Sequence, residues 1–169
     1  ISIDGTLTVG QVSGEALFSA PIEAASVDVQ DVGSIEVRDS MIARDGGVVL
    51  STSGALDIAG DIDTTSSAAN GDIDLRGATV RLEDSMLKTD GGLGSVEGPA
   101  TIQGSILIET GDDQSLIDAG DVQFANMITG FDGQGDELRV TATSGGTDGL
   151  VMFDETIELN QLEVDGDQI

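Results

Sequence analysis

The chain has 169 residues, of which 32 are acidic and 6 are basic, so its formal net charge at pH 7 is −26. Because phosphate recognition needs clustered Lys and Arg, this charge argues against nucleic acid and against anionic membrane surfaces as partners. The absence of His and Cys excludes nucleophile pairs of the Ser–His and Cys–His type. No apolar run approaches the roughly eighteen residues of a membrane-spanning helix, so no membrane insertion is expected.

The composition favours a narrow core of small side chains. There are 24 glycines, 2 prolines and 4 Phe, without Trp or Tyr. A globular core of this size normally uses large aromatic side chains, whereas rows of Val, Ile, Leu, Ala and Met suit a thin solenoid. A hydrophobic content of 38% with clear periodicity argues against disorder despite the charge.

Two explanations of the acidity compete. Acidic side chains keep a protein soluble in a salty medium, where screening over roughly 8 Å or less removes their mutual repulsion. Alternatively, Asp and Glu supply the oxygen ligands of calcium sites. Solvation is favoured over calcium as the main cause.

Residues 1–26 are predicted to form an irregular coil or a cap. Ile3, Leu7 and Val9 follow a strand–corner–strand rhythm, and the less regular stretch 15–26 is a candidate short helix or loop covering the end of a stack. The chain opens at Ile1 without a Met or a signal-like segment, as expected of a mature form or of a part of something longer.

Residues 27–95 hold the strongest pattern. Apolar and polar residues alternate in short runs, and each run ends at a Gly or Asp cluster that marks a corner. SIEVRDSMIARDGG (34–47) aligns without a gap to TVRLEDSMLKTDGG (79–92), two coils further along the chain. A repeat of roughly twenty to twenty-five residues, in which each turn buries the face of its neighbour, is the signature of a solenoid.

The repeat predicts which side chains are inside. Adjacent coils should stack like over like, with Leu56 and Val80 in the same sheet. Met41, Met86 and Met127 occupy matching coil positions and are predicted to form an apolar ladder. The residues expected to be buried are Val29, Val37, Val48, Leu56, Ile58, Ile73, Val80, Leu82 and Met86.

The rest of the chain is less regular. Gly-rich residues near 91–105 are predicted to form a looped insertion, because Pro99 cannot donate to a strand ladder. The solenoid is expected to span 27–135, with residues 136–169 as strands that end or continue the stack. No interdomain linker is evident.

The stretch GDIDLRGATVRLEDSMLKTDGG (71–92) resembles the repeats of filamentous haemagglutinin-type large exoproteins, which are secreted adhesins. The match is good over 27–95, partial over 120–135 and poor elsewhere. The resemblance implies a right-handed parallel β-helix, secretion across a bacterial outer membrane, and a role in adhesion or surface structure. The chain departs from the family in its extreme acidity and in lacking the N-terminal secretion module.

Three functions are weighed. The first is a non-catalytic extracellular rod of a bacterial surface protein or filament, which self-associates or stacks on neighbouring repeats and presents a surface to cell-surface glycans or proteins. The second is a pilus-like β-sandwich subunit that polymerises by strand donation. The third, a polysaccharide-acting β-helix enzyme, is less favoured because bases and aromatics are nearly absent.

Paired acids are the candidate catalytic residues. Asp112 and Asp113 resemble the paired aspartates of polygalacturonases, which use carboxylates as general acid and base. That family's His-bearing motif has no counterpart here. A solvated acidic turn is therefore favoured, and no catalytic residue is assigned.

The best metal candidate lies in MITGFDGQGDEL (127–138). Asp132, Asp136 and Glu137 resemble the calcium-binding aspartate–glycine turns of repeat-in-toxin proteins, but in one copy and not in tandem nonapeptides. Calcium is kept as an alternative at these three residues, and no other cofactor is expected. The turns at Asp45–Gly46, Asp90–Gly91, Asp148–Gly149 and Asp165–Gly166 are interpreted as turn chemistry, because Asp–Gly accepts positive φ.

Overall fold

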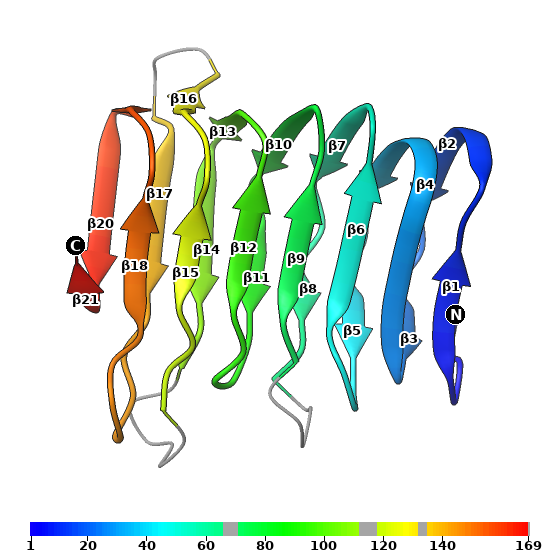
Figure 1. The fold of residues 1–169 in the computed structure, drawn as a ribbon, viewed down its shortest axis with the longest axis horizontal. Helices are drawn as coiled ribbons and strands as arrows, with labels where there is room; N and C mark the ends of the chain where they lie inside the picture. Colours follow the sequence, from blue (N-terminus) through cyan, green and yellow to red (C-terminus); the bar gives the residue numbers. More distant parts are fainter. Residues whose placement is uncertain (66–70, 112–117, 132–134, 169) are drawn as a thin grey trace.

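The structure is a computed structural model that describes residues 1–65, 71–111, 118–131 and 135–168. Parallel strands stack as a β-solenoid of about 7 turns, and the described residues contain no helix. In Figure 1 the near strands run upward and the chain returns behind them as it advances from the N-terminus, so the solenoid is right-handed. The predicted fold class is confirmed.

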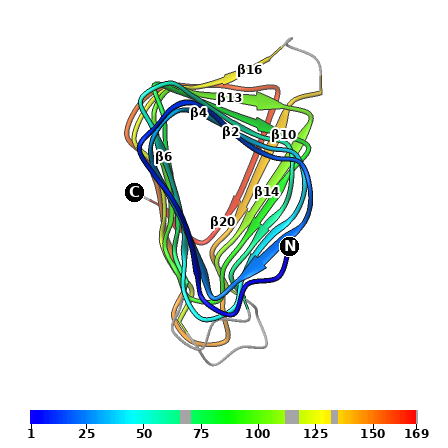
Figure 2. The same ribbon diagram turned by 90° about the vertical axis from the view of Figure 1, so that its right-hand side faces the viewer.

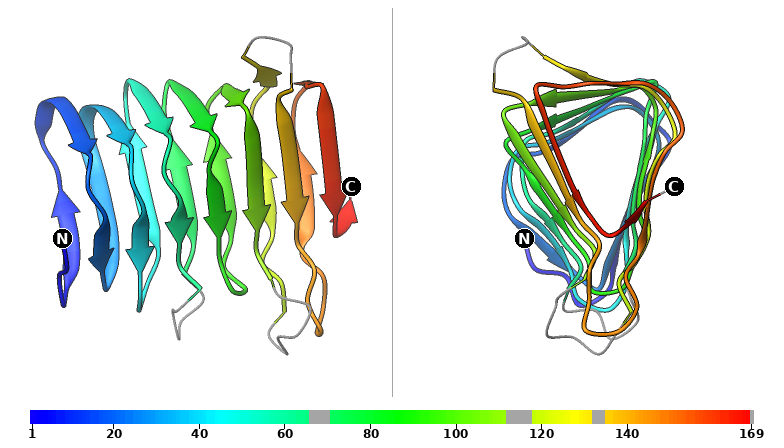
Figure 3. Two further views of the ribbon diagram at one scale, coloured as in Figure 1. Left: turned by 180° about the vertical axis from the view of Figure 1, so that it is seen from behind. Right: turned by 90° about the vertical axis from the view of Figure 1, so that its left-hand side faces the viewer.

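Each coil is triangular in cross-section, with three flat faces separated by corners (Figures 2 and 3). The strand β4 (Ser26–Val37) turns a corner without interruption and so joins the first two faces into one 14-stranded sheet, while the third face is a separate 7-stranded sheet. The first face contains β1 (Thr6–Val9), the start of β4, β6 (Val48–Thr52), β9 (Ile73–Arg76), β12 (Gly94–Glu97), β15 (Val122–Phe124), β18 (Leu150–Phe153) and β21 (Asp167–Gln168). The second contains β2 (Val12–Phe18), the end of β4, β7 (Ala55–Ile58), β10 (Thr79–Glu83), β13 (Ala100–Gln103), β16 (Ile128–Gly130) and β19 (Ile157–Glu158). The third contains β3 (Ile22–Ala24), β5 (Met41–Ala43), β8 (Ile62–Asp63), β11 (Met86–Lys88), β14 (Ser105–Glu109), β17 (Glu137–Thr141) and β20 (Gln161–Asp165).

Inward side chains form continuous columns along the axis. Leu56 pairs in register with Val80 of the next coil, as predicted, and Val80 pairs with Ala100. Because strands alternate with a period of two, every second side chain enters these columns. Of the residues predicted to be buried, all except Met86 are at most 2% exposed. Towards the C-terminal end, the rings of Phe124 and Phe153 stack within the same interior, 5.6 Å apart.

The prediction for Met86 is wrong by one position. Leu87, and not Met86, pairs with Ile62, which in turn pairs with Met41. Three residues separate the last inward side chain of the second face, Val37, from Met41, but four separate Leu82 from Leu87. A shift of one residue sends a side chain to the opposite face of a strand, so Met86 lies half-buried on the outside of the third face.

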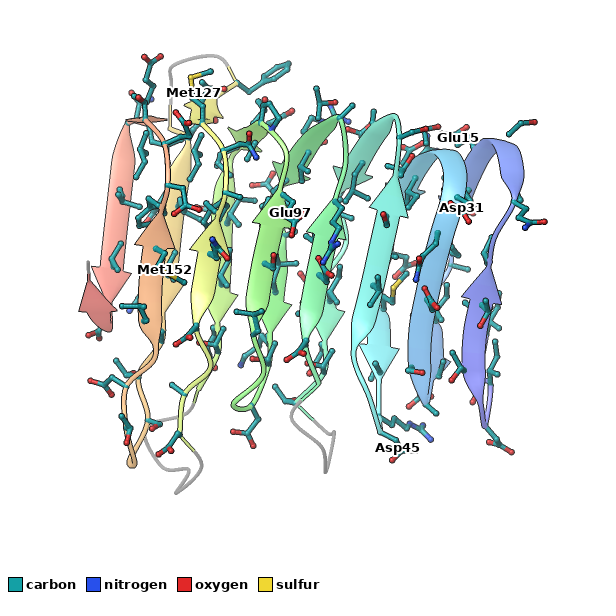
Figure 4. The ribbon with its side chains drawn as sticks, in the orientation of Figure 1. Glu15, Asp31, Asp45, Glu97, Met127 and Met152 are labelled. Carbon is teal, nitrogen blue, oxygen red and sulfur yellow. The ribbon has the colours of Figure 1, made fainter. Side chains whose placement is uncertain are left out.

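The predicted methionine ladder is therefore also wrong. Met41 is fully buried on the third face, whereas Met127 is 43% exposed just before β16 on the second face (Figure 4). The predicted looped insertion near 91–105 is likewise not found, because residues there form β12 and β13 in the stack. Pro99 sits in the corner between them, where its carbonyl accepts the N–H of Val80.

The alternative β-sandwich subunit is excluded for the described part of the chain, where every strand pair is parallel and follows the solenoid order. Residues 15–26, the candidate cap, lie mainly in β2 and β3 of the first coil. In the C-terminal segment 136–169, β17 to β21 continue the stack. No helix in the described ranges is long and apolar enough to cross a membrane.

A column of glycines lines the corner between the third and first faces. There, a Cβ on Gly92 would lie 2.3 Å from the carbonyl oxygen of Gly71, and one on Gly120 would lie 1.9 Å from that of Gly92. A side chain cannot occupy such positions without backbone movement, so glycine here permits coils to approach. Among the predicted Asp–Gly turns, Gly91 and Gly166 have positive φ of 81° and 149°, while Gly46 and Gly149 do not.

Candidate functional site

The predicted calcium residues are only partly within the described structure. Asp132 lies outside it, as do Asp112 and Asp113. The side chain of Asp136 is 2% exposed, and its Oδ1 accepts the backbone N–H of Gly104 at 3.1 Å. Glu137 accepts a hydrogen bond from Gln161 Nε2 at 3.2 Å and contacts Ser105 Oγ at 3.4 Å. Asp136 and Glu137 thus bind other coils.

No group of three His, Cys, Asp or Glu side chains among the described residues is placed to hold a metal ion. Calcium at Asp132, Asp136 and Glu137 therefore stays a prediction.

Corner aspartates connect neighbouring coils. In each of these contacts Oδ1 of an aspartate accepts a backbone N–H of another coil, at a position where the strand ladder is interrupted. Such a bond satisfies a donor that the sheet leaves without a partner. The pairs are Asp61 with Met86, Asp72 with Leu93, Asp84 with Ser105, Asp118 with Thr147, and Asp121 with Leu150, at 2.8–3.0 Å. Part of the acidity is therefore structural, a third explanation beside solvation and calcium binding.

The basic side chains lie between stacked acids. Each of the 6 Lys and Arg residues forms at least one ion pair with an acidic side chain. Arg76 lies 2.7 Å from Asp74 of its own strand and 3.6 Å from Glu97 of the next coil. The hydrogen bond from Arg38 lowers the pKa of Glu36, and the hydrogen bond to Asp74 raises the pKa of Arg76. An anionic ligand would have to compete with these acids for the basic side chains.

The third face carries the most varied outward surface. Its central outward column runs from Asp61 through Met86 and Leu107 to Arg139 in consecutive coils. A depression of about 250 Å³ lies over the middle of this column. Its lining comprises Asp61, Asp84, Ser85, Met86, Ser105, Ile106, Leu107, Glu137 and Arg139.

A second depression, of about 180 Å³, adjoins the first and shares Asp61 and Met86 with it. It continues over β5 and β8, with Ile42 and Lys88 on its lining. The Lys88 ammonium group lies 2.9 Å from Glu109. Together the two depressions form a surface that we name the third-face groove.

Comparison of the chain with family models, with curated proteins and with solved structures finds no significant match.

A further depression lies at the corner between the first two faces. It has a volume of about 560 Å³, and its lining includes Val12, Asp31 and the hydroxyl residues Ser13, Ser51 and Ser53. Asp31, labelled in Figure 4, and Gln11 both have positive φ, of 55° and 58°. The register between β2 and β4 shifts beside this corner, between Val12 and Glu15.

Sequence reasoning missed the third-face groove. A strand period of two, with Ile106 and Ile108 inside, places Leu107 on the outside. What it does not reveal is that Met86 of the preceding coil stands beside Leu107, because this depends on the longer corner before Leu87.

Proposed function

We propose that the chain is a non-catalytic extracellular rod, part of a bacterial surface protein or filament whose coils stack on those of another copy or of neighbouring repeats. The solenoid supports this proposal, since it is the fold that the resemblance to filamentous haemagglutinin-type repeats implies. The lack of His and Cys supports a non-catalytic role. Cell-surface glycans or proteins are the proposed adhesive partners.

The observation that carries the proposal is the state of the two end coils. Inner positions that are buried elsewhere are partly exposed there: Ile3, Leu7, Val9 and Phe18 in the first coil, and Ile157, Leu159 and Val164 in the last. Another coil would bury these side chains and pair the outer strand edges, which otherwise present unpaired N–H and C=O groups.

The two ends are compatible in position. Ser2 pairs with Glu23, so the first residues lie on the third face ahead of β3. At the other end β20 closes the third face and β21 begins a new turn on the first face. A second copy would place residues 1–3 over β20 and its β1 over β21.

A pair of introduced cysteines tests this arrangement. In the stacked register, Asp165 of one copy faces Ser2 of the next, and parallel neighbours about 4.8 Å apart suit a disulfide. We expect Ser2→Cys with Asp165→Cys to give a ladder of covalent multimers on oxidation. The pair Ser2→Cys with Glu163→Cys, displaced by two residues, is the control. Equal cross-linking in both variants, or none in either, would contradict end-to-end stacking of copies.

Calcium is a separate and optional part of the proposal. If Asp132, Asp136 and Glu137 hold the ion, the variant Asp132→Asn will lose a calcium-dependent rise in melting temperature.

A further inference from the structure

Two apolar side chains stand side by side on the outside of the rod. Met86 of β11 pairs in register with Leu107 of β14, and both are half-buried at outward positions. The positions before and after them in the same outward column are charged, Asp61 and Arg139. Met86 and Leu107 therefore provide an apolar floor beneath the larger depression of the third-face groove.

Three carboxylates surround this floor. Asp61 and Asp84 are exposed and Glu137 is half-buried, and all three line the depression. Each of the two aspartates uses Oδ1 for a backbone N–H of another coil. Among the described residues no ion pair joins these three acids to a base. The two bases on the groove lining, Lys88 and Arg139, are paired with Glu109 and Glu163.

The spacing of these acids suits an organic cation better than a metal ion. Asp61 and Asp84 belong to successive coils, which lie about 4.8 Å apart, and Glu137 lies two coils beyond Asp84. No group of three acids in the described chain can hold one metal ion. A lysine side chain combines a four-carbon stem, which packs on apolar surface, with a terminal ammonium that has three donors. The stem matches Met86 and Leu107, and the ammonium matches the surrounding carboxylates.

We propose that the third-face groove binds an extended, lysine-bearing segment of a partner protein. The groove runs along the axis from β5 to β17, and these five coils span roughly 19 Å, which is about five or six extended residues. A protein segment is favoured over a small molecule because the groove is open and continuous, and its negative charge complements a basic segment. This site adds to the proposed rod and needs no stacking between copies.

The direct test is binding of a seven-residue peptide of alternating lysine and serine, measured by calorimetry on the intact chain at 150 mM NaCl. The site variant combines Asp61→Asn, Asp84→Asn and Glu137→Gln, which keep an acceptor oxygen for the inter-coil bonds. We expect it to weaken peptide binding at least about tenfold, since each ammonium–carboxylate contact is a charge-assisted bond.

A matched control separates binding at the groove from general electrostatic attraction to a chain whose net charge is −26. The variant Asp4→Asn, Glu155→Gln and Glu158→Gln removes the same charge from exposed residues away from the groove, and should change affinity less than about twofold. A second variant, Met86→Gln, keeps the shape of the floor but not its apolarity, and should weaken binding about three- to tenfold.

Three outcomes would overturn the proposal. The first is an equal loss of affinity in the site variant and the charge-matched control, and the second is no peptide binding to the unmodified chain. The third is tighter binding of spermidine than of the peptide, which would assign the groove to small polyamines. A peptide with acetylated lysines should not bind. Circular dichroism melting confirms that each variant is folded, and the outcome does not depend on whether cysteine-bearing copies cross-link.

Discussion

The two halves of the solenoid differ in sequence regularity but not in stacking. Coils from β4 to β11 repeat visibly, as in the alignment of 34–47 with 79–92, whereas coils from β12 to β20 show little internal similarity. Yet inward columns pass from one half to the other, as in Leu82 and Ile102 on the second face and Leu87, Ile108 and Val140 on the third. The fold thus requires apolar residues at inward positions and corners at which the chain can turn from one face to the next. Other positions can vary in residue type.

The largest effect is expected from charged substitutions at inward positions. They test whether the stability of both halves depends equally on the columns of inward side chains. Leu82→Asp and Val140→Asp each place an unpaired charge at a fully buried position. The cost, at least about 3–5 kcal/mol, is a large share of a typical domain's stability. Both variants should lose most β-sheet circular dichroism at 25 °C, while Thr79→Asp at an exposed position of β10 should not. Tolerance of Val140→Asp alone would mean that the C-terminal half stacks loosely.

The glycines of the column between the third and first faces should be the next most sensitive positions. Gly120→Ala introduces a Cβ 1.9 Å from the carbonyl of Gly92, in the less regular half. Overpacking of this kind costs about 1–3 kcal/mol or more, and Gly92→Ala should behave similarly. Gly14→Ala, whose Cβ would meet no atom within 4 Å, is the control. Urea denaturation measures all three, and equal midpoints would refute close approach at this corner.

Buried threonine hydroxyls should contribute less to the free energy of unfolding than the glycine column does. Thr64, Thr89 and Thr110 each donate to the carbonyl of a glycine in the same column, at 2.5–2.7 Å. Thr110→Val leaves the carbonyl of Gly120 without this donor, which should cost about 1–3 kcal/mol. Thr101→Val, at an outward position of β13, should change the free energy of unfolding by less than about 0.5 kcal/mol.

Salt should have the smallest and most distributed effect. Repulsion among the acidic side chains, at a net charge of −26, predicts a higher melting temperature in 1 M NaCl than in dilute buffer. In 1 M NaCl the screening length falls to about 3 Å. If calcium sites cause the acidity, micromolar to millimolar Ca²⁺ will stabilise the chain while NaCl of equal ionic strength will not. A melting temperature unchanged by both treatments would leave the inter-coil aspartate contacts as the main role of the acids.

Much of the fold could be predicted because the inward side chains of a solenoid strand recur at every second residue. Val29, Leu56 and Ile73 are recognisable as inward from their neighbours alone. Corners could not be predicted as well, since their length is not tied to the period. One added residue before Leu87 moved Met86 to the outside, and the Gly-rich residues after Gly91 folded into β12 instead of leaving the stack.

The third-face groove depends on those same corners. Its acids and apolar residues are visible one by one in the sequence, but Asp61, Met86 and Leu107 meet only through the register between three coils. Asp136 shows the converse case. Its Asp–Gly setting resembled a calcium turn, whereas the structure buries it against the N–H of Gly104.

Amide hydrogen exchange, resolved by residue with NMR, tests most directly the central claim that stacking continues unbroken through the irregular half. Buried ladder amides open only by local or global unfolding, so their protection reports the stability of each coil. We expect amides of β14 and β17 to exchange as slowly as those of β7 and β10. Slow exchange confined to β4–β11, with rapid exchange across β12–β17, would contradict the account.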